Sequence, residues 1–298
     1  MPTAQPRRMR DYLGPVTNTD IWDSFTLRPD DVIVCTPPKC GTTWVLNIVM
    51  MLIHGRVVPD AGNREASPWL DAAFRDRPAV AAFLDGLTRR RCIKTHTPLD
   101  GIAFDADPAY VVVYRHPIDV HFSMRAHAAN MKHKMFEDLF PDDISAGFSR
   151  FVTGPMTDSG TDDLTVASIV HHFQQAKARA DRGNVQFFHY ADLSRDLAGQ
   201  IKRLAKIMGI SLPNATFAAL TEANTFASMR KVIEQSENRF GDTSPWHDAA
   251  NFFASGSSNK WEGQLNTSDL DLYTDRITAL VSDEDRAWLH WGDRRAPS

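Results

Sequence analysis

One segment constrains the fold more than any other: a short apolar run that ends at two prolines and leads directly into a helix-forming stretch. The run Val32–Cys35 is uncharged and largely β-branched, which is typical of a strand buried on both faces of a sheet. In the stretch after it, apolar residues recur nearly all round a helix that Thr42 or Thr43 can cap and that Gly55 ends. Strand, tight loop and buried helix in this order predict the first unit of a parallel α/β sheet.

The same alternation returns further along the chain. Apolar, β-branched runs indicate strands, and apolar residues at helical spacing indicate the helices between them. The predicted elements are strands at 91–95, 110–114 and 185–190, helices at 119–128, 166–173 and 197–208, and two short amphipathic helices beyond Leu270. This alternation predicts an α/β fold with a central, mostly parallel sheet flanked by helices.

The length of 298 residues and the 43% hydrophobic content suit one domain with a full-sized core. We expect a loose N-terminal arm over residues 1–20 and a single domain over residues 21–298. The arm carries arginines without a following apolar stretch, so no secretory signal is predicted, and no window is apolar enough to span a membrane. Two long polar stretches, 56–68 and 234–260, are either lids over a site or surface loops.

The charge balance excludes some classes of partner. The net charge of −4 provides no global field that would gather nucleic acid or an anionic membrane, so any anion must be bound by a local pocket. The odd number of cysteines, Cys35, Cys40 and Cys92, argues against a disulfide framework and favours a reducing compartment. We therefore expect a cytoplasmic protein.

The loop after the first strand has the features of an anion site. Because it opens a helix, backbone N–H groups and the positive end of the helix dipole converge there. Lys39 adds a mobile charge, Gly41 permits close approach of the backbone, and the hydroxyls of Thr42 and Thr43 add donors. These features predict a site for a phosphate-sized group, with a capped core helix beside an incidental lysine as the alternative.

This loop differs from the nucleotide triphosphatase loop in the order of its residues. Lys39 precedes Gly41 by two positions, whereas the triphosphatase pattern has the lysine directly after a glycine and before Ser or Thr. In that pattern the hydroxyl after the lysine holds magnesium. Here Thr42 and Thr43 are placed to bond the anion itself, so no metal is expected.

The segment Pro38-Lys39-Cys40-Gly41-Thr42-Thr43-Trp44 resembles the 5′-phosphosulfate loop of the cytosolic-type sulfotransferases, which use adenosine 3′-phosphate 5′-phosphosulfate (PAPS) as donor. Lys94-Thr95-His96, followed by Pro98, resembles the family's catalytic strand end. The segment from Tyr114 to Val120, with Ser123, resembles its 3′-phosphate segment. Weaker likenesses occur at Tyr190-Ala191-Asp192-Leu193 and at Phe226 with Met229.

The resemblance extends from about Asp31 to Trp261, in the family's order. It implies the sulfotransferase fold and a PAPS-dependent sulfotransferase. Such an enzyme transfers a sulfuryl group from PAPS to a hydroxyl of a small acceptor and releases adenosine 3′,5′-bisphosphate (PAP).

The resemblance assigns catalytic roles to three residues. His96 is implied as the general base, which suits a side chain that titrates near neutral pH at the carboxyl end of a parallel strand. Lys39 and Lys94 are implied as the cations that stabilise the oxygen bridging sulfur and the departing phosphate. A structural histidine and two surface ion-pair lysines are the alternatives.

The resemblance also assigns donor contacts, namely at Lys39, Cys40, Gly41, Thr42, Thr43, Trp44, Arg115, Ser123, Tyr190, Phe226 and Gly256. Arg115 and Ser123 match the positions that hold the 3′-phosphate, where the planar fork of an arginine suits phosphate geometry. Trp44 and Phe226 match the positions that sandwich adenine. An ordinary ion pair for Arg115, and core positions for the two aromatic residues, are the alternatives.

One family feature is missing. The family closes its nucleotide site with Arg-Lys-Gly followed by Trp, and here Gly256 and Trp261 remain while Ala254 and Ser255 stand in place of the two cations. Charge-assisted hydrogen bonds contribute roughly 1.5 to 3 kcal/mol each, so this loss would weaken binding of the donor. We hypothesise that Lys260, the serine hydroxyls and the backbone amides of this loop form a replacement anion site.

Other readings stay open from the sequence alone: a P-loop-type kinase of a small alcohol, an inactive PAP-binding module, or use of another donor. The acceptor is not defined by the motifs. The loop residues Trp69, Met131, Phe136 and Trp246 favour a hydrophobic alcohol or phenol. The family's C-terminal dimer motif has no counterpart between residues 265 and 280, so a homodimer is possible but not indicated.

Overall fold

The computed structural model describes residues 7–58, 68–133, 136–237, 246–248 and 258–293. Its centre is a four-stranded sheet with the order β2-β1-β3-β4, in which every neighbouring pair is parallel. The strands are β1 (Val32–Cys35), β2 (Cys92–Thr95), β3 (Ala109–Tyr114) and β4 (Val185–His189). Each of the four predicted strands is thus confirmed to within one residue at either end, and the predicted parallel sheet is confirmed.

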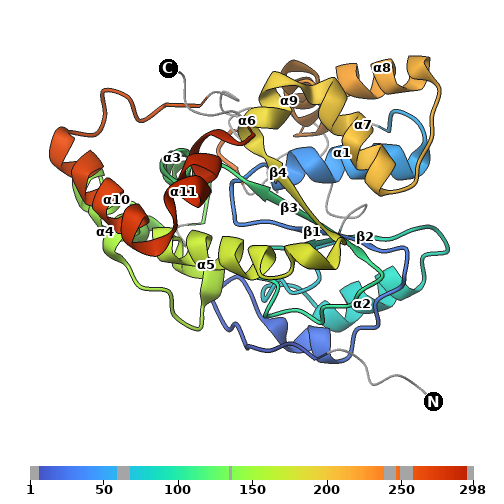
Figure 1. Cartoon of the computed structure of the whole chain (residues 1–298), viewed down its shortest axis with the longest axis horizontal. Helices are drawn as coiled ribbons and strands as arrows, with labels where there is room; N and C mark the ends of the chain where they lie inside the picture. The colour runs from blue at the N-terminus through green and yellow to red at the C-terminus, as the bar shows by residue number, and fades with distance from the viewer. Residues whose placement is uncertain (1–6, 59–67, 134–135, 238–245, 249–257, 294–298) are drawn as a thin grey trace.

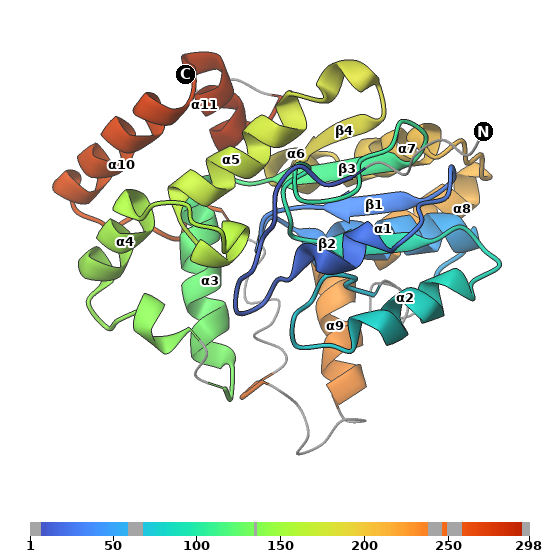
Figure 2. The same cartoon turned by 90° about the horizontal axis from the view of Figure 1, so that it is seen from below.

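Helices cover both faces of the sheet (Figure 1). One face carries α1 (Thr42–His54), α6 (Tyr190–Arg195), α7 (Leu197–Ile207), α8 (Asn214–Ala223) and α9 (Phe226–Glu237). The other carries α2 (Arg77–Asp85) and α5 (Val166–Lys177). A group made of α3 (Pro117–Asn130), α4 (Ile144–Thr153), α10 (Thr267–Leu280) and α11 (Asp283–Trp291) lies beyond one end of the sheet (Figure 2). Short 3₁₀ helices occur at η1 (Thr19–Asp23), η2 (Glu137–Leu139), η3 (Gly160–Asp163) and η4 (Ala180–Arg182).

The uninterrupted apolar run of β1 follows from its central place in the sheet. Val32 and Val34 pack into the core beneath α1, whereas Ile33 and Cys35 pack into the core on the opposite face. All four side chains are buried. Since successive residues of a strand point to opposite faces, a strand covered on both sides must be apolar at every position.

The parallel arrangement brings the carboxyl ends of all four strands to one edge, where α/β sheets place their sites. The residues that directly follow the strands are Thr36 after β1, His96 after β2, Arg115 after β3 and Tyr190 after β4. Three of these are predicted site residues, and the fourth opens the predicted anion loop. The sheet topology alone therefore assembles the core of the candidate site.

The described part of the N-terminal segment, residues 7–20, packs against the domain, which differs from the loose arm that its composition predicts. Tyr12 is fully buried, and its hydroxyl donates to Asp100 Oδ1 over 2.9 Å. The amide and hydroxyl of Thr17 both donate to the carboxylate of Asp162, at 2.7 and 2.9 Å. These contacts join residues 88 and 145 positions apart, so no local pattern in the sequence could reveal them. No helix among the described residues is long and apolar enough to cross a bilayer.

Candidate active site

The anion loop turns sharply between β1 and α1. Lys39 and Gly41 both have left-handed backbone conformations, with φ of 65° and 105°. Gly41 is the N-cap of α1, and no side chain caps the helix. The φ of Gly41 favours glycine, and a Cβ atom there would also lie 3.1 Å from Cδ2 of Tyr190, a tight contact. The first amides of α1, which no side-chain cap occupies, are at the place where an anion is predicted to bind.

The prediction that Thr42 or Thr43 caps this helix is wrong. Thr42 is already the first helical residue, and its hydroxyl lies 2.5 Å from the hydroxyl of Thr36. That bond ties the start of α1 to the end of β1. Thr43 is half-buried on the first turn. The capping position falls to Gly41 because the loop needs a left-handed residue there, which a threonine adopts only with strain.

His96 is oriented by the backbone of the loop's first residue. Its Nδ1 lies 2.6 Å from the carbonyl oxygen of Thr36. A carbonyl can only accept a hydrogen bond, so Nδ1 carries the hydrogen and the neutral ring has its lone pair on Nε2. Burial, and next the charge of Lys94, hold the pKa of His96 well below its usual value. His96 is therefore neutral at physiological pH and has a nitrogen that can take a proton.

The charges of two lysines, Lys39 and Lys94, act on this histidine. Nζ of Lys39 is 3.1 Å from Nδ1 of His127, and Nζ of Lys94 is 4.1 Å from the ring centroid of Trp69. Both lysines lower the pKa of His96, which shows that their charges are felt there. The pKa of Lys39 itself is lowered to about 7, chiefly by burial and then by the charges of Arg115 and Lys260. A concentration of positive charge with these properties is suited to an anion.

Arg115 and Tyr190 link the loop to the other strands. The guanidinium of Arg115 lies 4.2 Å from the ring centroid of Tyr190, and its Nε is 3.9 Å from a carboxylate oxygen of Asp119. Tyr190 also meets the ring of Trp44 edge-on, with centroids 5.4 Å apart. Tyr190 thus contacts two predicted donor-binding residues, one directly after β3 and one in α1, and it also limits the space at Gly41.

Three side chains on α3 form a row that begins beside Arg115 and ends beside Lys39. Asp119, Ser123 and His127 are four residues apart, so they lie along one side of the helix. The first of them contacts Arg115 and the last bonds Lys39, which leaves Ser123 between the two cations. Ser123 thus lies one helical turn from the residue that contacts Arg115, and convergence of Arg115 and Ser123 on one phosphate stays a prediction. His127 escaped the sequence reasoning, although its i, i+4 spacing from Ser123 was a usable signal.

The segments that carry Trp44 and Phe226 also meet. The indole N–H of Trp44 donates to the carbonyl oxygen of Asn224 over 2.9 Å, two residues before α9 begins at Phe226. Trp44 is buried in the core beneath the sheet, as is Met229, whereas Phe226 is only half-buried. Trp44 is therefore largely a core residue, which was the alternative to adenine binding, and the adenine-binding role of Trp44 and Phe226 stays a prediction.

The structure describes only part of the loop that we expect to replace the family's two cations. Gly256, together with Ala254 and Ser255, lies outside the described residues. In the part that is described, the amide of Asn259 donates to Oδ1 of Asp119 over 2.8 Å. The pKa of Lys260 is lowered by burial and then by Arg115, and Lys260 in turn lowers the pKa of Lys39. Lys260 therefore belongs to the same group of cations. Most of both predicted lids lies outside the described residues, and residues 234–237 of the second form the last turn of α9.

Aromatic residues border the site on its other side. The ring of Trp69 meets His96 edge-on at 4.7 Å, and the ring of Trp246 lies 4.8 Å from that of His127. Trp246 also pairs with Met131 through a backbone bridge, while Phe136 is buried. Of the four predicted acceptor-side residues, Trp69 thus contacts His96 and Trp246 contacts His127.

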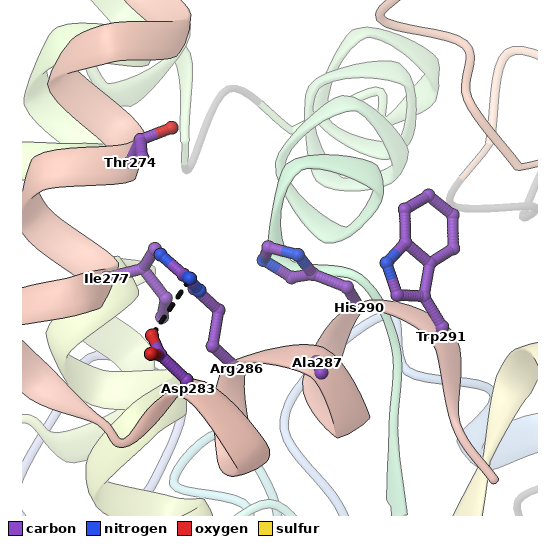
Figure 3. A pocket seen from close by; sticks show the side chains of 7 residues that line it. All are labelled: Thr274, Ile277, Asp283, Arg286, Ala287, His290 and Trp291. Carbon is purple, nitrogen blue, oxygen red and sulfur yellow. Dashed lines mark hydrogen bonds and ion pairs between the residues drawn. The ribbon is translucent and has the colours of Figure 1, made fainter. Parts of the chain in front are cut away.

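A separate cavity of about 400 Å³ lies between α10 and α11 (Figure 3). It is lined by Thr274, Ile277, Asp283, Arg286, Ala287, His290 and Trp291, none of which is a predicted site residue. His290 stacks on His116, the neighbour of Arg115, with ring centroids 4.2 Å apart. The C-terminal helix α11 therefore packs against the residues that follow β3. No group of three or more potential metal ligands occurs among the residues described.

Comparisons with known proteins show the family of this chain. The family model described as "Sulfotransferase domain" matches residues 29–284. A glycolipid sulfotransferase of Mycobacterium bovis is 32% identical over 300 residues, covering 92% of this chain and 91% of the relative. Human sulfotransferase 6B1 is 26% identical over 260 residues, covering 84% of this chain and 76% of the relative.

Solved structures share the fold. A retinol dehydratase in complex with androsterone and PAP superposes with a TM-score of 0.68 at 20% identity, covering 93% of this chain and 85% of that one. Mouse sulfotransferase SULT7A1 in complex with PAP gives a TM-score of 0.67 at 19% identity, covering 89% of this chain and 88% of that one. At these identities the likeness concerns the fold, and the predicted α/β architecture is confirmed in detail.

Proposed function

The chain belongs to the sulfotransferase family and is an enzyme of that family, and from this membership we propose that it transfers the sulfuryl group of PAPS to a hydroxyl of a small hydrophobic acceptor. The observation that carries the proposal is the placement of His96. Its lone pair on Nε2 lies at the strand edge shared with the anion loop, and the charges of Lys39 and Lys94 act on it.

The proposed chemistry is an in-line displacement at sulfur. Nε2 of His96 accepts the proton of the acceptor hydroxyl as its oxygen forms a bond to sulfur. The bond between sulfur and the bridging oxygen of the donor breaks, and negative charge collects on that oxygen. Lys39 and Lys94 stabilise this charge, which is the main electrostatic demand of such a transfer. The products are the sulfated acceptor and PAP.

The proposed donor site follows the strand edge. The amides of residues 41–44 and the hydroxyls of Thr42 and Thr43 hold the 5′-phosphate. Arg115, Ser123 and Lys260 hold the 3′-phosphate, which is supported by the nearness of the two cations: the charge of Arg115 contributes, after burial, to the lowered pKa of Lys260. In this arrangement no metal takes part, because hydroxyls and cations meet each charged group of the donor.

The proposed acceptor site is apolar. Trp69 and Trp246 stand beside His96 and His127, and ring faces of this kind suit an alcohol or phenol with a hydrophobic body. The mycobacterial relatives are named glycolipid sulfotransferases, and androsterone and retinol occupy two structures of similar fold. Glycolipids, steroids and terpenoid alcohols therefore belong in the acceptor panel beside phenols. The cysteines Cys35, Cys40 and Cys92 are all buried thiols, which supports a cytoplasmic setting.

The test is transfer of labelled sulfuryl from PAPS to this panel in the presence of a chelator. His96→Ala should lose at least three orders of magnitude in kcat/KM, while His54→Ala, at the far end of α1, should retain full activity. A wild-type protein that binds PAP yet sulfates no member of the panel would contradict the proposal. Stabilisation by ATP with magnesium, in place of PAP without metal, would favour the kinase alternative.

A further inference from the structure

A buried carboxylate that the proposed chemistry does not use lies directly behind the acceptor side of the site. Asp71 is fully buried, two residues after Trp69. Backbone bonds between residues 68–70 and Lys94 join its segment to the free edge of β2. Asp71 is thereby held next to the strand whose end carries His96.

Four donors surround this carboxylate. Oδ1 accepts from the indole N–H of Trp69 over 2.7 Å. Oδ2 accepts from the hydroxyls of Thr95 and Thr97, over 2.6 and 2.7 Å, and from the indole N–H of Trp22 over 2.9 Å. None of these partners carries a charge, and burial raises the pKa of Asp71. An anion buried among neutral donors is costly, and a saturated network of this kind fixes its members in one geometry.

The partners of Asp71 are the neighbours of the proposed catalytic groups. Thr95 and Thr97 flank His96 in the sequence, and the amide of Thr97 closes the turn by donating to the hydroxyl of Thr95 over 2.9 Å. The rings of Trp69 and His96 are nearly perpendicular to one another, and Lys94 lies over the face of the Trp69 ring. One carboxylate therefore binds the side chains of the two residues that flank His96 and the indole whose ring contacts His96.

We propose that Asp71 is a positioning residue that fixes His96 and Trp69 as one unit and thereby sets the efficiency with which the acceptor is used. The inference rests on the proposed function, since it assigns Asp71 to the acceptor half of that reaction. The hydrogen bonds of the Asp71 carboxylate reach no residue of the anion loop, so binding of PAP should not depend on Asp71. An asparagine offers one carbonyl oxygen and an amide whose hydrogens oppose the four donors, so it cannot replace the carboxylate.

The experiment compares Asp71→Asn with Asp31→Asn. Asp31 is an equally buried carboxylate at the opposite end of β1, where it pairs with Arg91 at 2.5 Å. Both variants should melt at a lower temperature. Using 2-naphthol as the reference acceptor, or the best acceptor of the panel, Asp71→Asn should lower acceptor kcat/KM at least tenfold and leave the Kd for PAP within threefold. Asp31→Asn should leave both within threefold.

A third variant tests the route of the effect and serves if Asp71→Asn does not fold. Trp69→Phe keeps a ring beside Lys94 and His96 but lacks the N–H that reaches Asp71. It should lower acceptor kcat/KM with an unchanged Kd for PAP, and the double variant should lose less than the product of the two separate losses. Equal effects of Asp71→Asn and Asp31→Asn, weakened PAP binding, or independent multiplication of the losses would overturn the inference. No transfer by the wild-type protein would instead refute the proposed function, and the inference with it.

Discussion

The charge on Lys39 should make the affinity for PAP fall as the pH rises above 7. In the nucleotide-free protein the pKa of Lys39 is about 7, because burial and then the charges of Arg115 and Lys260 disfavour its ammonium form. A bound nucleotide brings negative charge to this place and favours the ammonium form, so binding raises the pKa toward its ordinary range. A group whose pKa rises on binding takes up a proton, and the affinity then decreases with increasing pH.

The magnitude follows from the pKa. With a value of about 7, roughly half of Lys39 is charged at pH 7 and about 3% at pH 8.5. The affinity for PAP should therefore fall about 16-fold over this interval, equivalent to about 1.6 kcal/mol, provided that the bound state stays charged. The phosphates of PAP contribute little in this window, because their second ionisation lies near pH 6.

Calorimetric titration with PAP in buffers of different ionisation enthalpy measures both quantities. We expect uptake of about half a proton at pH 7 and nearly one at pH 8.5. Lys39→Arg is the matched control, because a guanidinium stays charged throughout and should abolish the pH dependence. A wild-type affinity that is flat between pH 7 and 8.5, or an equal slope in Lys39→Arg, would refute the reasoning.

The other predictions concern the base, the replacement cation and the loop. Because the pKa of His96 lies well below 6.5, the base stays neutral in mild acid, and the acid limb of the kcat/KM profile should fall below pH 6.5; a limb at or above that value would count against His96. Lys260→Ala should weaken PAP binding at least tenfold, by the loss of about 1.5 to 3 kcal/mol, while exposed Lys231→Ala should not, as measured by calorimetry. Gly41→Ala should abolish PAP-induced thermal stabilisation. Gly209 also has a positive φ but open space around it, so Gly209→Ala should only lower the melting temperature. Similar behaviour of the two variants would show that backbone strain alone matters.

The sheet, and the candidate residues that directly follow its strands, could be predicted from the sequence because the strands depend on local patterns. A strand covered on both faces is apolar at each residue, as Val32–Cys35 shows, and a parallel sheet puts the ends of its strands together. His96 and Arg115 follow such strands directly, so finding the strands located these residues as well.

Contacts between distant segments could not be predicted. Tyr12 and Asp71 have no periodic pattern around them, and their partners lie up to 159 positions away. His127 contacts Lys39 only because α3 runs past the anion loop and brings these two side chains together. The error at Thr42 has a different origin, since the preference of threonine for capping positions was outweighed by the need for a left-handed residue at Gly41.

A crystal structure of the protein with PAP tests most directly whether this strand edge is a sulfuryl-transfer site. We expect the 5′-phosphate on the amides of residues 41–44, the 3′-phosphate beside Arg115 and Lys260, and Nε2 of His96 facing the position of the missing sulfuryl group. A nucleotide bound elsewhere, or a metal ion between the loop and the 5′-phosphate, would contradict the proposed site.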